Sequence, residues 1–343
     1  MMGKKALILV NTGTPDTPAV KDVRRFLSAF LNDRRVIDLS WIARKILVNL
    51  IIVPFRAPRS AALYRRLWTE EGSPLLVNLG KLVVGLQEML GESCHVIGAM
   101  RYGNPSLEKA FDRITGEGYD EIIVFPMYPH YASSTTGSVH ELVMKQASGL
   151  NVIPPVRFIS QYYSHPSFVQ AWTEIIKKYN PETFDHILFS YHGLPVRQVG
   201  KVHPGISCID CSCAESMPEH GKYCYRAACY ETTRLIASRL GLAEGNYSTA
   251  FQSRLTRNWL SPFTDQVLAK LASGNKRRVL VAAPSFTADC LETLVEIGHE
   301  YKSLFEQAGG EELAMAESLN DSRIWMNAIA EITGLKTESH DRV

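Results

Sequence analysis

Short apolar runs alternate along the chain with longer segments in which apolar residues recur every three or four positions. The first run, KALILVN at 5–11, is apolar almost throughout and predicts a strand buried on both faces. Similar runs predict strands at 94–100 and 120–126. The amphipathic segments predict helices near 18–31, 41–53, 77–90 and 105–116, and another opened by the residues 133–138.

The same alternation continues in the second half of the chain. A strand at 152–158 is expected to begin it, and the elements that follow are a helix at 165–179, a strand at 186–191, an irregular cysteine-rich segment, a helix near 224–241 and strands at 247–252 and 278–284. Strands that alternate with helices favour parallel sheets covered by helices. The sequence therefore predicts an α/β fold.

Two similar halves indicate two domains, which we expect at 1–150 and 151–335. The second domain would carry the cysteine-rich insert at about 200–229. The pattern leaves open whether the last helix packs back on the N-terminal half. The final residues, KTESHDRV, are expected to form a frayed tail.

Composition narrows the class of protein. The chain has 343 residues, of which 45% are apolar and 21% charged, as in ordinary globular proteins. A net charge of +2 gives no field suited to nucleic acid, so we expect no nucleic-acid partner. The N-terminal sequence does not resemble a signal peptide, and the apolar runs are too short to predict a transmembrane span. A cytoplasmic protein is therefore expected.

Five of the seven cysteines lie within 22 positions, which is an unusual density. Because no export signal is evident, disulfides are not expected, and a metal or an iron–sulfur cluster explains the cysteines better. The five are Cys208, Cys211, Cys213, Cys224 and Cys229.

The helix expected at 41–53 is apolar nearly all round toward its end, up to Phe55. It is either a core helix or an exposed apolar lip for a greasy ligand or a membrane surface. Arg56 and Arg59 follow directly. Apolar surface beside arginines suits a flat hydrophobic molecule that carries carboxylates, although a solvated basic helix face explains the arginines equally well.

His192 stands at the end of a predicted strand, in the segment SYHGLP. In open α/β sheets this edge is where ligands bind, although a histidine there can also be purely structural. About a hundred residues later, Asp289, Glu292 and Glu296 share one side of a predicted helix at i, i+3 and i+7. A strand-end histidine and an acidic row suggest a site for a divalent cation, a proton or both, whereas the row alone could be a solvated face.

Several strand-end loops carry aromatic side chains: Tyr128 and Tyr131, Tyr191, and Trp259. Such residues often serve packing alone. Gathered around one cleft, they would hold a large planar ring by stacking.

At this point the chain resembles the ferrochelatase family, whose members insert ferrous iron into a porphyrin at the end of haem synthesis. The resemblance runs through motifs in one order over nearly the full length: LVNTGTPD, MRYGNPS, FPMYPHYASSTTGS, SYHGLP, FQSR with WLSP, PSFTADCLETLVEI and AESLND. It implies two Rossmann-like domains with parallel four-stranded sheets flanked by helices, as in chelatases.

The resemblance also implies an activity and residue roles. The chain would be a lyase-type metal chelatase that converts protoporphyrin IX and ferrous iron into protohaem and releases two protons. His192 and Glu292 would be catalytic, and Asp289 and Glu296 would lead metal to them. The segments expected to bind porphyrin contain Thr12, Arg56, Arg59, Arg101, Tyr128, Ser253 and Trp259. A non-catalytic tetrapyrrole or haem carrier and a coproporphyrin-using ferrochelatase are the alternatives.

Some bacterial members of the family carry a [2Fe–2S] cluster in a segment at this place, which implies one in the insert. Four thiolates suffice for such a cluster. Cys229 lies within a helical pattern, so we expect Cys208, Cys211, Cys213 and Cys224 to be the ligands. A structural zinc site is the alternative. Peripheral attachment at the inner face of a membrane, through the apolar lip, is a further expectation, and the sequence leaves monomer and homodimer open.

Overall fold

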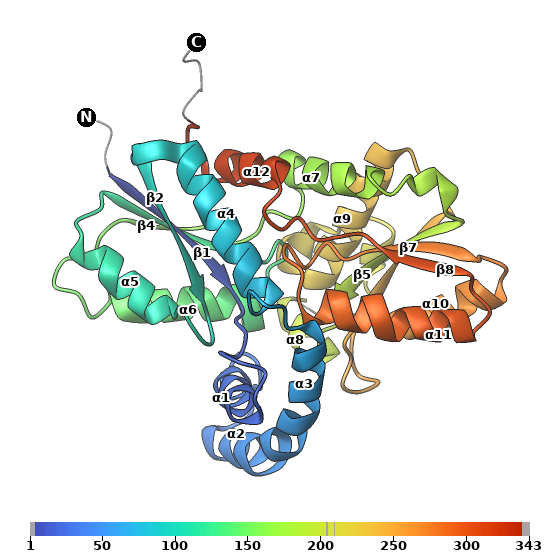
Figure 1. The fold of residues 1–343 in the computed structure, drawn as a ribbon, viewed down its shortest axis with the longest axis horizontal. Coiled ribbons are helices and arrows are strands. Elements are labelled where there is room, and N and C mark those ends of the chain that lie inside the picture. The colour runs from blue at the N-terminus through green and yellow to red at the C-terminus, as the bar shows by residue number, and fades with distance from the viewer. Residues whose placement is uncertain (1–3, 204, 209, 338–343) are drawn as a thin grey trace. The chain divides into compact units, whose positions relative to one another are not determined.

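The computed structural model describes residues 4–203, 205–208 and 210–337, so most of the tail expected to fray lies outside the described residues (Figure 1). The chain divides into two compact units. The first unit comprises 1–128, 133–161 and 321–343, and the second comprises 129–132 and 162–320. Each unit contains one sheet.

The sheet of the first unit is parallel, with the strand order β2-β1-β3-β4. Its strands are β1 (Lys5–Asn11), β2 (Cys94–Met100), β3 (Glu121–Pro126) and β4 (Val156–Phe158). β1 lies in the interior of the sheet and is buried at every residue from 6 to 11, which explains its unbroken apolar sequence.

The helices of the first unit are α1 (Val20–Leu31), α2 (Trp41–Ile46), α3 (Val53–Leu67), α4 (Pro74–Leu90), α5 (Leu107–Gly116), α6 (Ser138–Ala147) and α12 (Arg323–Thr333). α5 and α6 cover one face of the sheet, where Ile8 and Val10 of β1 pack with Phe111 and Val143. α4 packs against β2. Both arrangements bury apolar strand faces beneath amphipathic helices.

The C-terminal helix α12 belongs to the first unit, although it comes from the far end of the chain. Trp325 is fully buried and meets Phe125 of β3 with ring centroids 6.1 Å apart. Thr333 accepts a hydrogen bond through its carbonyl oxygen from Arg157, at 2.8 Å. The first unit is thus completed by residues that follow the second unit along the chain.

The sequence predicted that a strand at 152–158 begins the second half of the chain. The structure places this strand in the sheet of the first unit instead. It is β4, a three-residue edge strand that pairs in parallel with β3 in the first unit. The main division between the units falls after 161 rather than after 150. An edge strand is half-exposed and short, so its sequence contains little information about which sheet it joins.

The second unit repeats the design, with a parallel sheet in the order β6-β5-β7-β8. Its strands are β5 (His186–His192), β6 (Tyr247–Gln252), β7 (Arg278–Ala282) and β8 (Glu312–Met315). Both sheets are therefore four-stranded, parallel and flanked by helices, which confirms the expected fold class. β8 was not predicted. It has only four residues, which are too few to show the alternation or the apolar run that indicates a strand.

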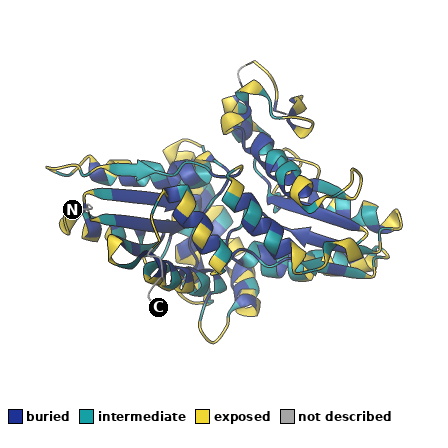
Figure 2. Cartoon of the chain, turned by 90° about the horizontal axis from the view of Figure 1, so that it is seen from above, coloured by how far each residue is buried: buried dark blue, intermediate teal, exposed yellow. Residues whose placement is uncertain are grey.

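The helices of the second unit are α7 (Pro166–Lys177), α8 (Val196–Val199), α9 (Tyr225–Leu240), α10 (Thr264–Ser273) and α11 (Lys302–Gln307). A π-helical segment, Glu292–Tyr301, leads directly into α11. Leu188 and Val281 of the sheet share one apolar cluster with Leu268 of α10 and Phe305 of α11. The strands of both sheets are largely buried, as their dark blue colour shows in Figure 2.

In each sheet the strand order reverses beside the first strand of the unit, between β1 and β3 and between β5 and β7. Loops that leave such a point diverge to opposite sides and open a crevice at the carboxyl ends of the strands. Thr12 follows β1 and Tyr128 follows β3. In the second unit His192 ends β5 and Ser285 follows β7.

One continuous helical stretch, Trp41–Leu67, runs through α2, a π-helical turn and α3. It is long and apolar enough to cross a membrane by length and composition, so the expectation that no such stretch exists is wrong. Only 28% of its most apolar window is buried within the protein. The stretch is therefore not the core helix that one interpretation of the sequence favoured.

Candidate functional site

His192 is partly exposed at the end of β5. Nδ1 lies 2.6 Å from the carbonyl oxygen of Gly193. Because a carbonyl oxygen can only accept, Nδ1 carries the proton and Nε2 keeps its lone pair in the neutral ring. Nε2 can therefore accept a proton or bind a metal ion.

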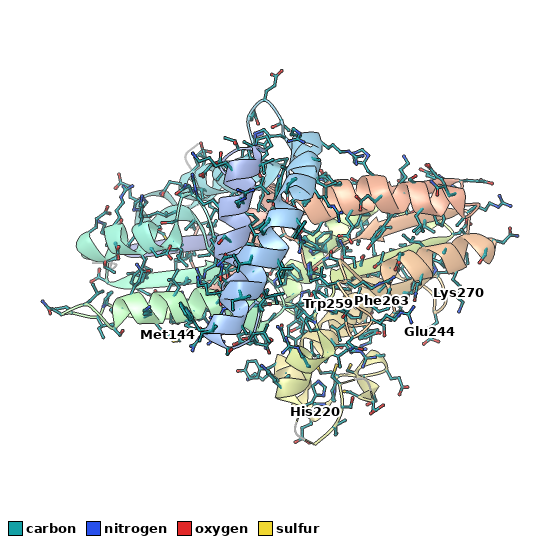
Figure 3. All side chains as sticks on the ribbon, turned by 90° about the horizontal axis from the view of Figure 1, so that it is seen from below. Met144, His220, Glu244, Trp259, Phe263 and Lys270 are labelled. Carbon is teal, nitrogen blue, oxygen red and sulfur yellow. The ribbon has the colours of Figure 1, made fainter. Side chains whose placement is uncertain are left out.

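Two aromatic side chains lie beside this imidazole. The rings of Trp259 and Phe286 have their centroids 6.3 Å and 6.2 Å from that of His192. Trp259 belongs to the loop between β6 and α10 (Figure 3). This loop is tied to the segment after His192, because Leu260 donates its N–H to the Leu194 carbonyl at 2.9 Å.

A second attachment fixes the same loop from its other end. Arg254 forms two hydrogen bonds with the carboxylate of Asp265, at 2.6 Å and 2.7 Å, and its guanidinium lies 4.0 Å from the ring centroid of Phe263. Bidentate pairing and stacking both restrict the orientation of an arginine. The aromatic wall beside His192 is therefore held by its backbone and by this clamp.

The predicted acidic row does not lie on a regular α-helix. Asp289 precedes the helix, and Glu292 and Glu296 lie on the π-helical segment. Such widened turns are rare and occur frequently at functional sites. Sequence spacing could not show this, because apolar residues every three or four positions fit both kinds of helix.

Glu296 and Asp289 are held by hydrogen bonds within the unit. Glu296 accepts from the N–H of Ser253 at 2.8 Å, from its hydroxyl at 2.5 Å and from the Tyr301 hydroxyl at 2.6 Å. Buried Asp289 accepts from the side-chain amide of Asn320 at 2.8 Å. Ser253, expected to contact porphyrin, therefore also fixes the orientation of Glu296.

Glu292 has different surroundings. It is half-buried and lies beside the thiol of Cys290, whose pKa is raised well above its usual value by burial and by the nearby carboxylate. The backbone carbonyl of Glu292 accepts a hydrogen bond from the Gln252 amide at 3.0 Å, which ties the start of the π-helical segment to the end of β6. The carboxylate thus stands on an anchored backbone.

In the first unit, two of the predicted residues meet where the strand order reverses. Tyr128 donates its hydroxyl hydrogen to the Thr12 hydroxyl at 2.9 Å. Burial raises the pKa of Tyr128, so the phenol stays neutral at physiological pH. Arg56 and Arg59 are exposed on α3, following the exposed ring of Phe55.

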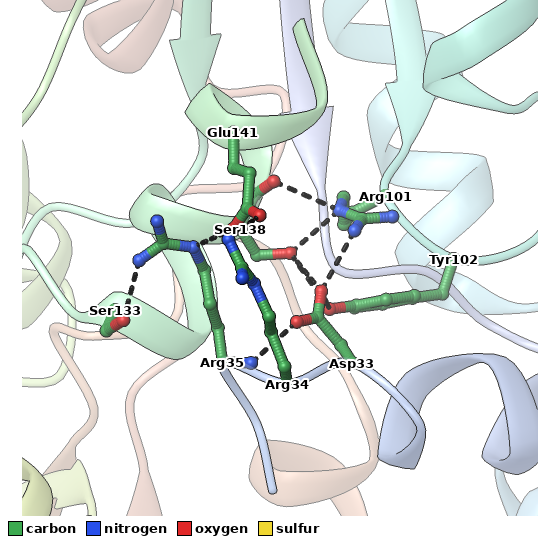
Figure 4. Close-up of polar contacts among 8 residues, drawn as sticks. All are labelled: Asp33, Arg34, Arg35, Arg101, Tyr102, Ser133, Ser138 and Glu141. Carbon is green, nitrogen blue, oxygen red and sulfur yellow. Dashed lines mark hydrogen bonds and ion pairs between the residues drawn. The ribbon is translucent and has the colours of Figure 1, made fainter. Parts of the chain in front are cut away.

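Arg101 takes part in a polar network (Figure 4). It forms an ion pair with Asp33 at 2.9 Å and donates to the Ser138 hydroxyl at 2.8 Å. Tyr102 also donates to Asp33, at 2.7 Å. Burial raises the pKa of Asp33, but hydrogen bonds from Ser138, the Arg35 N–H and Tyr102, together with the charge of Arg101, outweigh it and lower the pKa overall.

The Arg226 guanidinium is bound to the cysteine-rich insert through one sulfur and two backbone carbonyl oxygens. Cys208, Cys211, Cys213 and Cys224 are all buried. Arg226 donates to the carbonyl oxygens of Cys208 and Cys211, at 2.9 Å and 3.1 Å, and to the sulfur of Cys213 at 3.2 Å. A cation placed in this way stabilises thiolates.

The state of these thiols reflects their proximity. A hydrogen bond from Cys213 lowers the pKa of Cys224, and the same bond raises that of Cys213. Burial raises the pKa of Cys208 to about 11. Cys229 lies within α9, where full burial raises its pKa well above the usual value.

Two histidines that sequence reasoning did not single out reach the same place. His203 Nε2 lies 2.9 Å from the sulfur of Cys224, and His220 Nε2 lies 3.5 Å from that of Cys211. The ligand atoms of His203, Cys211 and His220 all lie within 4.8 Å of one another. The signal in the sequence was two histidines inside the insert, at 203 and 220. The donor set fits either a four-thiolate iron–sulfur cluster or a mixed cysteine and histidine metal site.

Solved structures share the overall fold. The sirohydrochlorin chelatase SirB of Bacillus subtilis subspecies spizizenii, in complex with cobalt, matches with a TM-score of 0.54 and 11% identity over 96% of this chain and 93% of that one. SirB from Bacillus subtilis with Fe³⁺ gives 0.52 and 13%, over 96% and 94%. The fold is thus that of the chelatases.

Sequence comparison places the chain within that class. The ferrochelatase family profile matches residues 4–336. Proteins named ferrochelatase from Legionella pneumophila (strain Lens) and Bdellovibrio bacteriovorus are each 40% identical over 96% of this chain and over 98% and 99% of their own. One from Coxiella burnetii is 41% identical over 96% and 93%. The chain belongs to the ferrochelatase family.

Membership of this family establishes the general activity that the sequence predicted. The chain is an enzyme that inserts iron into a porphyrin in haem synthesis. Neither a non-catalytic carrier nor a coproporphyrin-using enzyme is favoured over this assignment.

The network around Arg101 yields a prediction about stability. Because the pKa of Asp33 is lowered in the folded chain, its ionised form stabilises the fold at neutral pH, and this contribution is lost as pH falls through the lowered pKa. Asp33→Asn should reduce the free energy of unfolding at pH 7 by about 3 kcal/mol, since it leaves Arg101 unpaired. Urea unfolding followed by circular dichroism measures this effect.

The exposed ion pair between Glu71 and Lys81 provides the control. Glu71→Gln should change the unfolding free energy by less than about 1 kcal/mol. The difference between wild type and Asp33→Asn should shrink as pH falls. A difference that is constant with pH would show that the charge of Asp33 is not what stabilises the network.

Proposed function

We propose that this enzyme inserts ferrous iron into protoporphyrin IX, with His192 as the group that accepts pyrrole protons. The observation that carries the proposal is the contact of His192 Nδ1 with the Gly193 carbonyl oxygen, which leaves Nε2 of the neutral ring with a lone pair, beside the rings of Trp259 and Phe286. Metallation requires two pyrrole N–H protons to leave, and these are too weakly acidic to leave unaided at neutral pH. A neutral imidazole is a suitable acceptor.

Binding energy supplies the other requirement of the reaction. Bending the macrocycle exposes the lone pairs of its nitrogens, and stacking on aromatic side chains such as Trp259 can sustain that distortion. Arg56 and Arg59, exposed beside Phe55, suit the propionate groups of the porphyrin. Thr12, Tyr128 and Ser253 supply hydroxyl groups from strand-end loops, and we propose that each contributes a polar contact to porphyrin binding.

The three acids divide into two roles. Asp289 and Glu296 accept fixed hydrogen bonds, so they supply a steady negative field and hold their surroundings in place. We propose that Glu292, whose backbone is anchored by Gln252, holds the ferrous substrate or relays a proton. Arg101 is paired with Asp33, which fixes its orientation, and we propose that it contributes to porphyrin binding from its loop.

Loss of His192 should abolish turnover and spare porphyrin binding. His192→Ala should lower kcat by about 10²-fold to 10⁴-fold, and Glu292→Gln by on the order of 10²-fold, as for displaced acid–base groups. Anaerobic assays with ferrous iron and protoporphyrin IX measure turnover, and quenching of porphyrin fluorescence measures binding. Coproporphyrin tested alongside should turn over more slowly.

The exposed His299, on the same π-helical segment as Glu292, gives a matched control. His299→Ala should retain the wild-type rate. A His192→Ala protein with near wild-type kcat would remove His192 from the mechanism, and one that no longer binds porphyrin would assign it a role in binding.

We also propose that Cys208, Cys211, Cys213 and Cys224 hold a [2Fe–2S] cluster. The burial of all four and the contacts of Arg226 with Cys208, Cys211 and Cys213 support this ligand set, and the position of Cys229 within α9 supports its exclusion. Bound there, the cluster would supply a redox-active centre, yet porphyrin metallation transfers no electrons. The proposed role is therefore structural or regulatory.

A structural zinc ion is the second candidate, because His203 and His220 approach the sulfurs of Cys224 and Cys211. Two imidazoles and two thiolates would complete a tetrahedral set. Removing either imidazole separates the candidates, since the four-thiolate cluster needs neither as a ligand.

Anaerobically purified protein should be coloured and contain two irons and two sulfides per chain, the content of one such cluster. Cys213→Ser should lose both, whereas the matched variant Cys229→Ser should keep both. Elemental analysis and visible absorbance are the measurements. A colourless protein with one zinc that disappears in His220→Ala would establish the zinc site instead.

Finally, we propose that the enzyme is cytoplasmic and attaches peripherally to a membrane. Trp41, Ile42, Leu50, Ile51 and Phe55 are all more than half exposed on the stretch Trp41–Leu67. Monomers rarely leave such contiguous apolar surface in water. Haem is hydrophobic, so a lipid-facing surface would favour its release.

Replacing part of this surface should weaken lipid binding. The double variant Leu50→Glu with Phe55→Glu should lose most co-sedimentation with vesicles that contain anionic lipid, because two exposed apolar side chains that would enter the lipid become charged. Val152, also exposed in the first unit, gives the control Val152→Glu, which should bind as the wild type does. Equal binding by all three proteins, or no binding at all, would contradict peripheral attachment through this surface.

A further inference from the structure

We propose that Tyr225 is a positioning residue for His192 and transmits the state of the cysteine site to it. This rests on the proposed metal site in the insert, because Tyr225 directly follows Cys224. The hydroxyl of Tyr225 donates to the backbone carbonyl oxygen of His192 at 2.8 Å. The catalytic histidine and a candidate metal ligand are thus joined by one side chain.

The hydrogen bond from Tyr225 to the His192 carbonyl takes the place of a strand-to-strand hydrogen bond that the end of β5 lacks. β5 pairs with β6 as far as His192, but it pairs with β7 only as far as Phe189. On the β7 side, the end of β5 therefore has no neighbouring strand within the sheet. Its backbone groups need other partners, because buried N–H and C=O groups are costly to leave unpaired.

Tyr225 and Ser285 supply those partners. The N–H of His192 lies 3.2 Å from the Ser285 hydroxyl, to which it donates. The Ser285 hydroxyl in turn bonds to the phenol of Tyr225, which donates to the His192 carbonyl. The three residues form a closed ring of hydrogen bonds around the backbone that carries the catalytic imidazole. Moving the phenol would release both sides of that backbone.

Three consecutive residues at the start of α9 each make a contact that links the insert or His192 to this helix. Cys224 caps the helix, since its sulfur accepts from the N–H of Ala227 at 3.5 Å. Tyr225 is the first helical residue and reaches His192. Arg226 binds the carbonyl groups of the insert loop at Cys208 and Cys211. This one turn therefore joins the insert to the end of β5.

Metal binding would stiffen that turn. A helix terminus frays readily, because its first N–H groups have no partner within the helix. With Cys224 fixed to a metal, the cap and the turn would stay in place. Without metal, the turn depends on weaker contacts: the cap, the Arg226 hydrogen bonds and the contact of His203 with the Cys224 sulfur. The occupied site would therefore hold Tyr225, and through it His192, in the productive position.

Tyr225→Phe tests the link directly, because it removes one hydroxyl from a buried ring and leaves the ring itself. In the full chain, kcat should fall about twofold to tenfold, as expected when the hydrogen bond that holds the His192 carbonyl is lost. The KM for porphyrin and the iron and sulfide content should stay unchanged. The ring signal of His192 in ¹³C-histidine NMR, identified by its absence in His192→Ala, should shift.

Cys213→Ser, which removes a ligand but leaves the helix cap, should lower kcat and shift the His192 signal in the same direction. Tyr223→Phe alters an exposed ring in the insert and should change neither. The double variant Cys213→Ser with Tyr225→Phe should be no slower than the slower single variant, because both changes break one connection. Chelator-stripped wild type gives the same comparison without a substitution.

Additive losses in the double variant, or an unmoved His192 signal in Tyr225→Phe, would overturn the coupling. If the insert holds no metal, neither Cys213→Ser nor the chelator would change kcat or the His192 NMR signal. That result would refute both the metal site and its coupling to His192. Tyr225→Phe would then still shift the His192 signal if Tyr225 positions the histidine, so the two failures are distinguishable.

Discussion

The structure depends on the burial of its parallel strands. Because helices cover both faces of each sheet, strand interiors accommodate apolar side chains, and polar chemistry is confined to strand ends. The functional side chains then lie at the carboxyl ends of those strands between which the strand order reverses. Thr12 and Tyr128 meet at the reversal in the first unit, and His192 and Ser285 meet at the one in the second. The same constraint thus prepares two sites with different chemistry.

Within the second unit, fixed hydrogen bonds prepare the site for reaction. The Gly193 carbonyl sets the tautomer of His192, and Ser253 with Tyr301 sets the orientation of Glu296. Groups oriented before the substrate arrives need not reorganise during the reaction, which is the main source of electrostatic stabilisation in enzymes. The site therefore depends as much on hydroxyl and backbone groups as on the acids and the histidine.

Sequence patterns predicted most of this where the determinant is local. β1 and β5 are interior strands with unbroken apolar runs, and the turn after His192 follows from Gly193 and Pro195. The patterns failed where tertiary context decides. β4 and β8 are short edge strands, the π-helical turn under Glu292 has no periodic signature, and His203 meets Cys224 only after the insert has folded.

The path of the chain has a consequence for synthesis on the ribosome. α12 buries Trp325 against Phe125 of the first unit, although nearly two hundred residues separate them. Domains usually fold in the order in which they are made. Here the whole second unit is translated before α12 is made. Until then, the surface of the nascent first unit that α12 covers, including Phe125, stays exposed. The stage most exposed to aggregation and most dependent on chaperones is therefore the interval between synthesis of the second unit and synthesis of α12.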